Sequence, residues 1–118
     1  MKEPESGQNK FSKQSNMTST QNINQLINFQ EGAVVSKEIV NQPTGTITLF
    51  AFDKGQGLSE HTAPYDALVV ITEGLAEITV SGIRHEVKVG EMLLMPANAP
   101  HALKAIQPFK MVLTMIKS

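Results

Sequence analysis

From residue 33 onward the chain is a series of short runs rich in valine, isoleucine and threonine, interrupted by glycine and proline, and this rhythm restricts the possible fold more than any other feature. Turns that recur about every 8 to 12 residues are typical of β-sandwiches and β-barrels. Within residues 46–49 and 77–80 polar and apolar side chains alternate, as in a strand with one buried face. Ser81-Gly82 lies between two runs and predicts a tight hairpin turn. The sequence therefore predicts an all-β domain, and the runs that carry this prediction are 33–40, 46–52, 67–72, 76–80, 83–89, 92–95, 101–105 and 111–116.

Residues 1–21 differ from the rest of the chain, because they consist mainly of Lys, Glu, Ser, Gln, Asn and Thr. After the initial methionine, Phe11 and Met17 are the only large apolar residues in this segment, too few to offset the entropy lost on ordering it. We expect a disordered polar leader over residues 1–21 and one folded domain over residues 22–118. Apolar residues spaced three and four apart in residues 23–27 predict a short N-terminal helix, which is stable only if it docks on the domain.

Composition excludes several classes of protein. The chain of 118 residues has no cysteine, which excludes disulfides and thiolate metal sites, and its ten basic and eleven acidic residues give a formal net charge of −1. With no run of Lys and Arg, one tyrosine and no tryptophan, it lacks the signature of a nucleic-acid-binding protein. The longest apolar stretch, residues 67–71, is too short to span a membrane, and the N-terminus has no apolar secretory core. We expect a cytoplasmic protein that binds neither nucleic acid nor membranes.

The histidines are the clearest candidates for chemistry. His61 follows a glycine-containing loop, and His101 follows the proline-bounded segment 96–100, so each stands where a strand meets a loop. Barrels commonly hold their ligands at such strand ends. His85, the third histidine, lies between an arginine and a glutamate and is interpreted as a solvated surface residue. His61 and His101 are therefore the candidate site residues.

These two histidines belong to two spaced motifs. The first is defined by Gly55, His61, Ala63, Ala67 and Gly74, and the second, after a gap of 15 residues, by Gly90, Pro96, Asn98, His101 and Ala105. In this spacing the chain resembles the cupin family, specifically its small single-domain bacterial members. The resemblance covers roughly residues 32–116 and implies a jelly-roll barrel, also called a double-stranded β-helix. Asn98 stands at a position where the family usually has glycine, and asparagine tolerates similar backbone angles.

The resemblance also implies a metal site. In cupins the first motif supplies two histidines and a glutamate to one metal ion, and the second motif supplies one histidine. His61 and His101 match two of these ligands, whereas Ala63 and Ala67 occupy the other two positions. Two imidazoles without a carboxylate leave a divalent ion with uncompensated charge and open positions, so Zn, Fe, Mn or Ni would be weakly bound or absent. Gln56, in the preceding loop, is a further candidate donor.

The geometry of the first motif follows if residues 61–67 form one regular strand. His61, Ala63 and Ala67 would then share one face, and Asp66 would point to the opposite face, out of reach of the site unless a bulge re-aims it. On that prediction the backbone positions of a four-ligand metal site are all retained, and only two of the four ligating side chains are missing.

Three classes of function remain open. In the first, a small molecule binds through a loosely held metal at His61 and His101 or directly to these imidazoles. A catalytic member of this class would resemble small cupins with dioxygenase, isomerase or decarboxylase activity, and its histidines would be ligands or an acid/base pair. In the second, the domain is a non-catalytic ligand-binding or sensing module without metal. In the third, the barrel is an empty scaffold. The sequence leaves enzyme activity open.

One run predicts how the domain assembles. Residues 68–71 are all apolar, so a strand formed by them has two apolar faces and needs cover on both sides. The barrel interior can cover one face, and a second sheet or another subunit must cover the other. We expect a homodimer.

Overall fold

The computed structural model describes residues 18–117 and confirms the all-β class. The helical part of that range is a single 3₁₀ turn, and no helix in it has the length and apolar character that a membrane crossing requires. The strands are β1 (Val34–Gln42), β2 (Gly45–Phe52), β3 (Gly57–His61), β4 (Asp66–Glu73), β5 (Leu75–Val80), β6 (Ile83–Lys88), β7 (Met92–Met95), β8 (His101–Ala105) and β9 (Phe109–Ile116).

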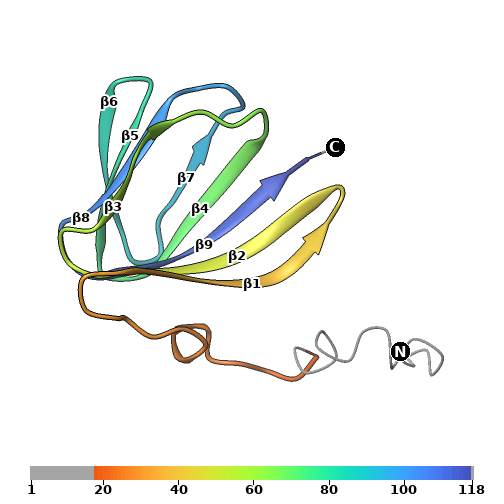
Figure 1. Cartoon of the computed structure of the whole chain (residues 1–118). Helices are drawn as coiled ribbons and strands as arrows, with labels where there is room; N and C mark the ends of the chain where they lie inside the picture. Colours follow the sequence, from red (N-terminus) through yellow and green to blue (C-terminus); the bar gives the residue numbers. More distant parts are fainter. Residues whose placement is uncertain (1–17, 118) are drawn as a thin grey trace.

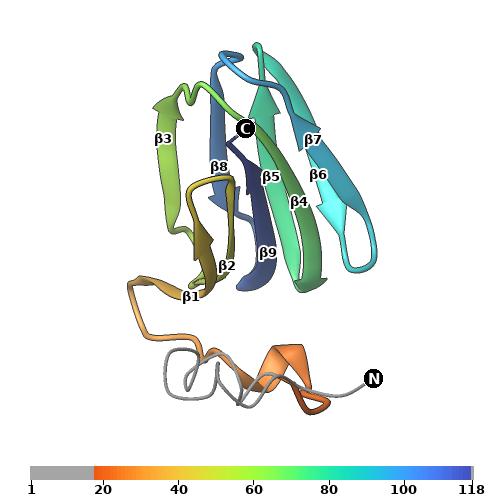
Figure 2. The same cartoon turned by 90° about the vertical axis from the view of Figure 1, so that its right-hand side faces the viewer.

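The strands form two antiparallel sheets that face one another (Figures 1 and 2). The five-stranded sheet has the order β1-β2-β9-β4-β7, and the four-stranded sheet has the order β3-β8-β5-β6. No strand pairing joins the two sheets among the described residues, so the predicted barrel is not closed by a continuous hydrogen-bonded ladder. The fold is a jelly-roll-like sandwich whose interior lies between the inner faces of the sheets.

Most strands coincide with the runs expected from the sequence, and β3 is the exception. Its sequence, Gly-Leu-Ser-Glu-His, contains one large apolar residue, so neither alternation nor β-propensity indicates a strand. The hairpin turn between β5 and β6 is confirmed. Ser81 and Gly82 have φ angles of 51° and 81°, and two positive φ angles are characteristic of the type I′ turn that suits the twist of a hairpin.

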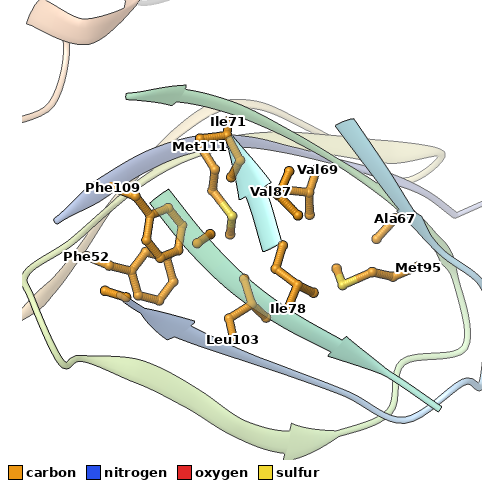
Figure 3. Close-up of a cluster of buried hydrophobic side chains, with 12 residues drawn as sticks. Phe52, Ala67, Val69, Ile71, Ile78, Val87, Met95, Leu103, Phe109 and Met111 are labelled. Carbon is orange, nitrogen blue, oxygen red and sulfur yellow. The ribbon is translucent and has the colours of Figure 1, made fainter. Parts of the chain in front are cut away.

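The core lies between the sheets and is built from inward-facing aliphatic and aromatic side chains of both (Figure 3). Phe52 and Phe109 stack with ring centroids 4.4 Å apart and planes inclined by 9°. Ile71, Ile78 and Val69 are also fully buried. Fully burying each such side chain contributes about 1.5–3 kcal/mol, so a core of this size can stabilise the domain without disulfides.

The N-terminal helix predicted for residues 23–27 is only a 3₁₀ turn, Ile23–Gln25, capped by the side chain of Asn22. A single turn is too short to persist alone, and the residues that follow it are stabilised by packing. Ile27 is buried with Leu49 and Ala51 in a second apolar cluster on the outer face of the five-stranded sheet. The segment therefore docks on the domain, as its apolar residues require.

A buried lysine fixes this segment. The ammonium group of Lys110, on β9, donates a hydrogen bond to the backbone carbonyl of Asn24 at 2.6 Å and lies 3.5 Å from a carboxylate oxygen of Glu73. It also lies 4.9 Å from the centre of the Phe29 ring. The side-chain amide of Asn24 donates to the carbonyl of Thr72 at 2.9 Å. Residues 22–29 thus form a strap that covers one end of the outer face.

The strap predicts unequal effects of two truncations. Deleting residues 1–21 should leave the melting temperature nearly unchanged, since Thr18 to Gln21 are exposed and the leader has little to bury. Deleting residues 1–29 should also remove Ile27 and Phe29, at a cost of about 3 kcal/mol or more. For a domain of this size that loss lowers the melting temperature by roughly 10 °C or more. Differential scanning calorimetry measures both, and equal effects would contradict this account of the strap.

Candidate functional site

Three loops meet at one end of the sandwich, which we call the mouth (Figure 1). They are residues 62–65 between β3 and β4, the β5–β6 turn, and residues 96–100 between β7 and β8. Backbone hydrogen bonds join them: the N–H of Asn98 donates to the carbonyl of Ala63 at 2.7 Å, and the N–H of Ser81 donates to that of Pro100 at 2.8 Å. The mouth is therefore a connected frame rather than three separate loops.

His101 is the first residue of β8 and lies on the inner face at the mouth. The turn before it contains Asn98 at a φ of 67°, the left-handed conformation that asparagine was expected to tolerate in place of glycine. The residue is only 6% exposed, and the Nδ1 of its imidazole lies 3.0 Å from the carbonyl oxygen of Ala99. Burial and this contact fix the orientation of the ring.

His61 faces His101 because β3 contains a bulge. Leu58 pairs with Leu103 and His61 pairs with His101, so three steps along β3 correspond to two along β8. The extra residue falls opposite Ala102. In a regular ladder His61 would point outward, because a shift of one residue moves each side chain to the other face.

A glycine allows this close pairing. A Cβ atom at Gly57, near the start of β3, would collide with the backbone carbonyl of Leu103 on β8. Only glycine therefore fits where β3 meets β8. Since neither the bulge nor the close approach leaves a periodic signal, the inward orientation of His61 on β3 could not be derived from alternation.

The two imidazoles meet through their Nε2 atoms, which are 3.0 Å apart (ring centroids 4.3 Å apart, planes inclined by 72°). The Nδ1 of His61 lies 2.7 Å from the carbonyl oxygen of Ser59, and the Nδ1 of His101 lies 3.0 Å from that of Ala99. A carbonyl can only accept, so each Nδ1 carries the proton and each neutral ring has a lone pair on Nε2. Two lone pairs at this distance repel one another. The pair is satisfied when a cation, either a proton or a metal ion, lies between the two nitrogens.

The other positions of the first motif do not lie on one strand, so the prediction of a regular strand over residues 61–67 is wrong. His61 ends β3 in the four-stranded sheet, residues 62–65 form a loop, and Ala67 lies on β4 in the opposite sheet. Ala67 is buried on the inner face (Figure 3), and Asp66 is exposed, with its carboxylate accepting a hydrogen bond from the N–H of Ala97 at 2.8 Å. Asp66 therefore lies on the outer side of β4, bonded to the loop of residues 96–100, while Ala67 reaches the interior from the facing sheet.

Gln56 lies at the other end of β8. Its carbonyl accepts a hydrogen bond from the N–H of Ala105 at 2.8 Å, and Ala105 is four residues from His101. Four residues of strand span about 13 Å. The structure therefore does not bring Gln56 to the two histidines.

His85 differs from its interpretation as a solvated surface residue. It pairs with Ile78, which is fully buried, and paired residues share a face, so its side chain lies on the inner side of β6 and is half-buried. The interpretation rested on the charged neighbours Arg84 and Glu86, but their side chains alternate with that of His85 along β6 and lie on the outer face.

The comparisons with known proteins agree with the geometry. Residues 48–117, more than half of the chain, match the model of the Cupin domain family. The chain belongs to the cupin family. No curated protein sequence matches this cupin.

Solved structures give the same assignment. The cupin is similar to a conserved protein of unknown function from Streptococcus pyogenes, with 36% identity over 85% of this chain and 88% of that one and a TM-score of 0.82. It is also similar to a cupin 2 conserved barrel domain protein from Leptotrichia buccalis, with 40% identity and a TM-score of 0.77. That match covers 79% of this chain and 45% of the other, so the cupin spans less than half of the Leptotrichia protein. A cupin superfamily protein from Desulfitobacterium hafniense matches at 29% identity over 80% of this chain and 86% of that one, with a TM-score of 0.77.

The residues at the mouth fit half of a cupin metal site. Bonds of about 2.1 Å to one cation place two nitrogens about 3.0 Å apart at an angle of about 90° and about 3.4 Å apart at the tetrahedral angle, so the 3.0 Å separation of the histidine pair fits the narrower angle. Among residues 18–117, however, no group of three or more His, Cys, Asp or Glu side chains is arranged to hold a metal ion. The described part of this cupin therefore offers two imidazole ligands and no carboxylate.

A hollow of about 360 Å³ lies elsewhere, over the outer face of the four-stranded sheet. Its lining includes Ser59, Thr79, Ala102 and Lys104. Ala102 and Lys104 alternate on β8 with the buried His101 and Leu103, so the hollow and the histidine pair are on opposite faces of one sheet. Since the outer face of an antiparallel sheet is commonly polar and solvated, we assign the candidate site to the mouth.

Proposed function

We propose that this cupin domain binds a small organic anion at its mouth, where His61 and His101 hold it through a proton or a weakly bound divalent cation. The single observation that carries the proposal is the 3.0 Å separation of the two Nε2 atoms, combined with Nδ1 atoms that both lie against backbone carbonyls. In this arrangement both Nε2 atoms are directed at one position, where a single cation can contact both rings.

A positive charge at the histidine pair favours an anionic ligand. A proton between the imidazoles gives the pair one positive charge, and a divalent ion gives it two. No group of three metal-binding side chains in residues 18–117 supplies a compensating carboxylate. Partly burying a charge without a counter-charge costs free energy. An anionic ligand supplies that counter-charge, so its binding is electrostatically favourable. His61 is exposed and His101 is buried, which makes the pair accessible from the solvent side of His61.

Of the metals expected from the sequence, Zn, Fe and Ni suit imidazole ligands, whereas Mn prefers oxygen ligands. When bound, such an ion would polarise an oxygen of the ligand as a Lewis acid. His61 and His101 would hold it through Nε2, while their Nδ1–H groups stay on the backbone carbonyls and keep the rings oriented. Water or the ligand would fill the remaining positions, so we expect weak binding of the metal alone.

A second function, a metal-free ligand-binding or sensing module, is favoured by one observation. The described residues supply two metal-binding side chains at the mouth, whereas catalytic metal sites commonly have three protein ligands. In that case the shared proton alone provides the positive charge, and the anion binds to the imidazole pair directly.

Calorimetric titration with zinc and nickel, on protein prepared without a histidine tag, separates the two functions. We expect weak binding by the native chain, its loss in both His61→Ala and His101→Ala, and its persistence in the control His85→Ala. Titration with acetate, followed through the ¹⁵N shifts of the imidazoles, tests the anion in the absence of metal. Acetate binding without metal binding would select the metal-free module. A native chain that binds neither metal nor acetate at these histidines would overturn the proposed function.

A further inference from the structure

The histidine pair continues into a row of apolar side chains across the mouth. His61 pairs with His101, His101 pairs with Val80 on β5, and Val80 pairs with Ile83 on β6. Side chains of directly paired residues in an antiparallel sheet lie on the same face. The inner face of the four-stranded sheet therefore presents two imidazoles followed by two aliphatic groups, in a line from β3 to β6.

The end of this row is open to solvent. In the row at the far end of the same face, Ala105, Ala76 and Val87 are all buried, whereas Ile83 at the mouth is 63% exposed. Its neighbour Arg84 points to the outer face, where its guanidinium lies 3.6 Å from the carboxylate of Glu77, which is consistent with an inward Ile83. A large aliphatic side chain thus stands uncovered at the rim of the candidate site.

We infer that the anion bound at the mouth carries an apolar group that packs on Val80 and Ile83. This inference rests on the proposed function, and it adds the class of ligand: a carboxylate, or another small anion, with an aliphatic or aromatic body. Strands in a sheet are about 4.8 Å apart, so Ile83 lies two strand spacings, about 10 Å, from His101. An anionic head at the histidines places a body of that length over both aliphatic side chains and covers the exposed surface of Ile83.

A series of straight-chain carboxylates tests the inference on the full chain. Dissociation constants for acetate, butanoate, hexanoate and octanoate are measured by NMR titration below the concentrations at which octanoate aggregates. Burial of a methylene contributes up to about a fourfold gain in affinity, so the affinity should rise along the series until the chain passes the rim. Ile83→Ser should weaken octanoate about tenfold and leave acetate unchanged.

Two matched variants separate the contributions. Val89→Ser changes another exposed aliphatic residue, 58% exposed and placed at the opposite end of β6, and should leave every affinity unchanged. His61→Ala should weaken all four carboxylates by a similar factor, since it removes the head-group contact and keeps the apolar wall. Both serine substitutions lie at exposed sites, and melting curves verify that the variants fold.

The outcomes distinguish the two proposals. If carboxylates bind in a His61-dependent manner but the affinity is independent of chain length, or if Val89→Ser weakens octanoate as much as Ile83→Ser, the inference about Ile83 is wrong and the proposed function stands. If no carboxylate binds, or binding does not depend on His61, the proposed function is wrong and the inference falls with it.

Discussion

Replacing Ala63 with histidine and Ala67 with glutamate is expected to tighten the binding of zinc or nickel by two orders of magnitude or more, about 3 kcal/mol. The change adds a third imidazole and an anionic ligand at the positions that carry ligands elsewhere in the cupin family. The backbone at both positions is already placed: the carbonyl of Ala63 is bonded to the N–H of Asn98, and Ala67 is buried on the inner face of β4. Calorimetric titration of the native and doubly substituted chains measures the gain.

The control for this prediction is the chain with Ala63→His and Ala67→Gln. Glutamine has nearly the shape of glutamate without its charge, so it should recover only part of the gain. Because position 67 is buried, the melting temperature of the metal-free variants must be measured alongside, and we expect the glutamate to destabilise the metal-free chain. A folded double variant that binds metal no better than the native chain would show that the side chains at positions 63 and 67 do not converge on the histidines.

Leu94→Lys is expected to convert a homodimer into a monomer. On the outer face of the five-stranded sheet Leu68 pairs with Leu94 and Val70 pairs with Met92. Leu94 and Met92 are 54% and 69% exposed, and Ile116, on β9 of the same sheet, is 55% exposed. The strap covers only the other end of this face. An apolar surface of this kind, bordered by the exposed Asp66 that pairs with Ile116, can pack against a second copy of itself.

A lysine at the centre of such an interface would bury an unpaired charge in both subunits and raise the dissociation constant of the dimer by about a hundredfold or more. Light scattering at micromolar concentration should give twice the single-chain mass of 12.9 kDa for the native chain and the single-chain mass for Leu94→Lys. Val89→Lys, which changes an exposed aliphatic residue away from this face, should stay dimeric. A native chain that scatters as a monomer would refute the homodimer.

Strands with a clean period could be predicted because their side chains report one buried face. Residues 77–80 on β5 are an example. The Ser81-Gly82 turn and the left-handed conformation of Asn98 could also be predicted, the first from its residue types and the second from its position in the motif. The two histidines were predicted from their positions where strands meet loops and from the spacing of the motifs. Alternation alone would not have found them, since His61 lies on a strand whose sequence has no strand-like pattern.

What the sequence did not reveal depends on contacts between distant segments. The bulge in β3 exists because of its pairing with β8, and nothing within residues 57–61 marks it. The half-buried position of His85 follows from its partner Ile78 across the hairpin, whereas its charged neighbours suggested exposure. The docking of the strap could not be predicted from residues 22–29 alone either, because it depends on Lys110, a residue 86 positions away from Asn24.

The frame of the mouth is built from main-chain hydrogen bonds, and this has a consequence for how such a site can diverge. The bonds from Asn98 to Ala63 and from Ser81 to Pro100 use only amide and carbonyl groups, which persist whatever side chain is attached, as long as the donating residue is not proline. Metal ligands can therefore be lost or regained at Ala63 without loosening the loops. At this position the set of ligating side chains can therefore change independently of the main-chain frame that joins the loops.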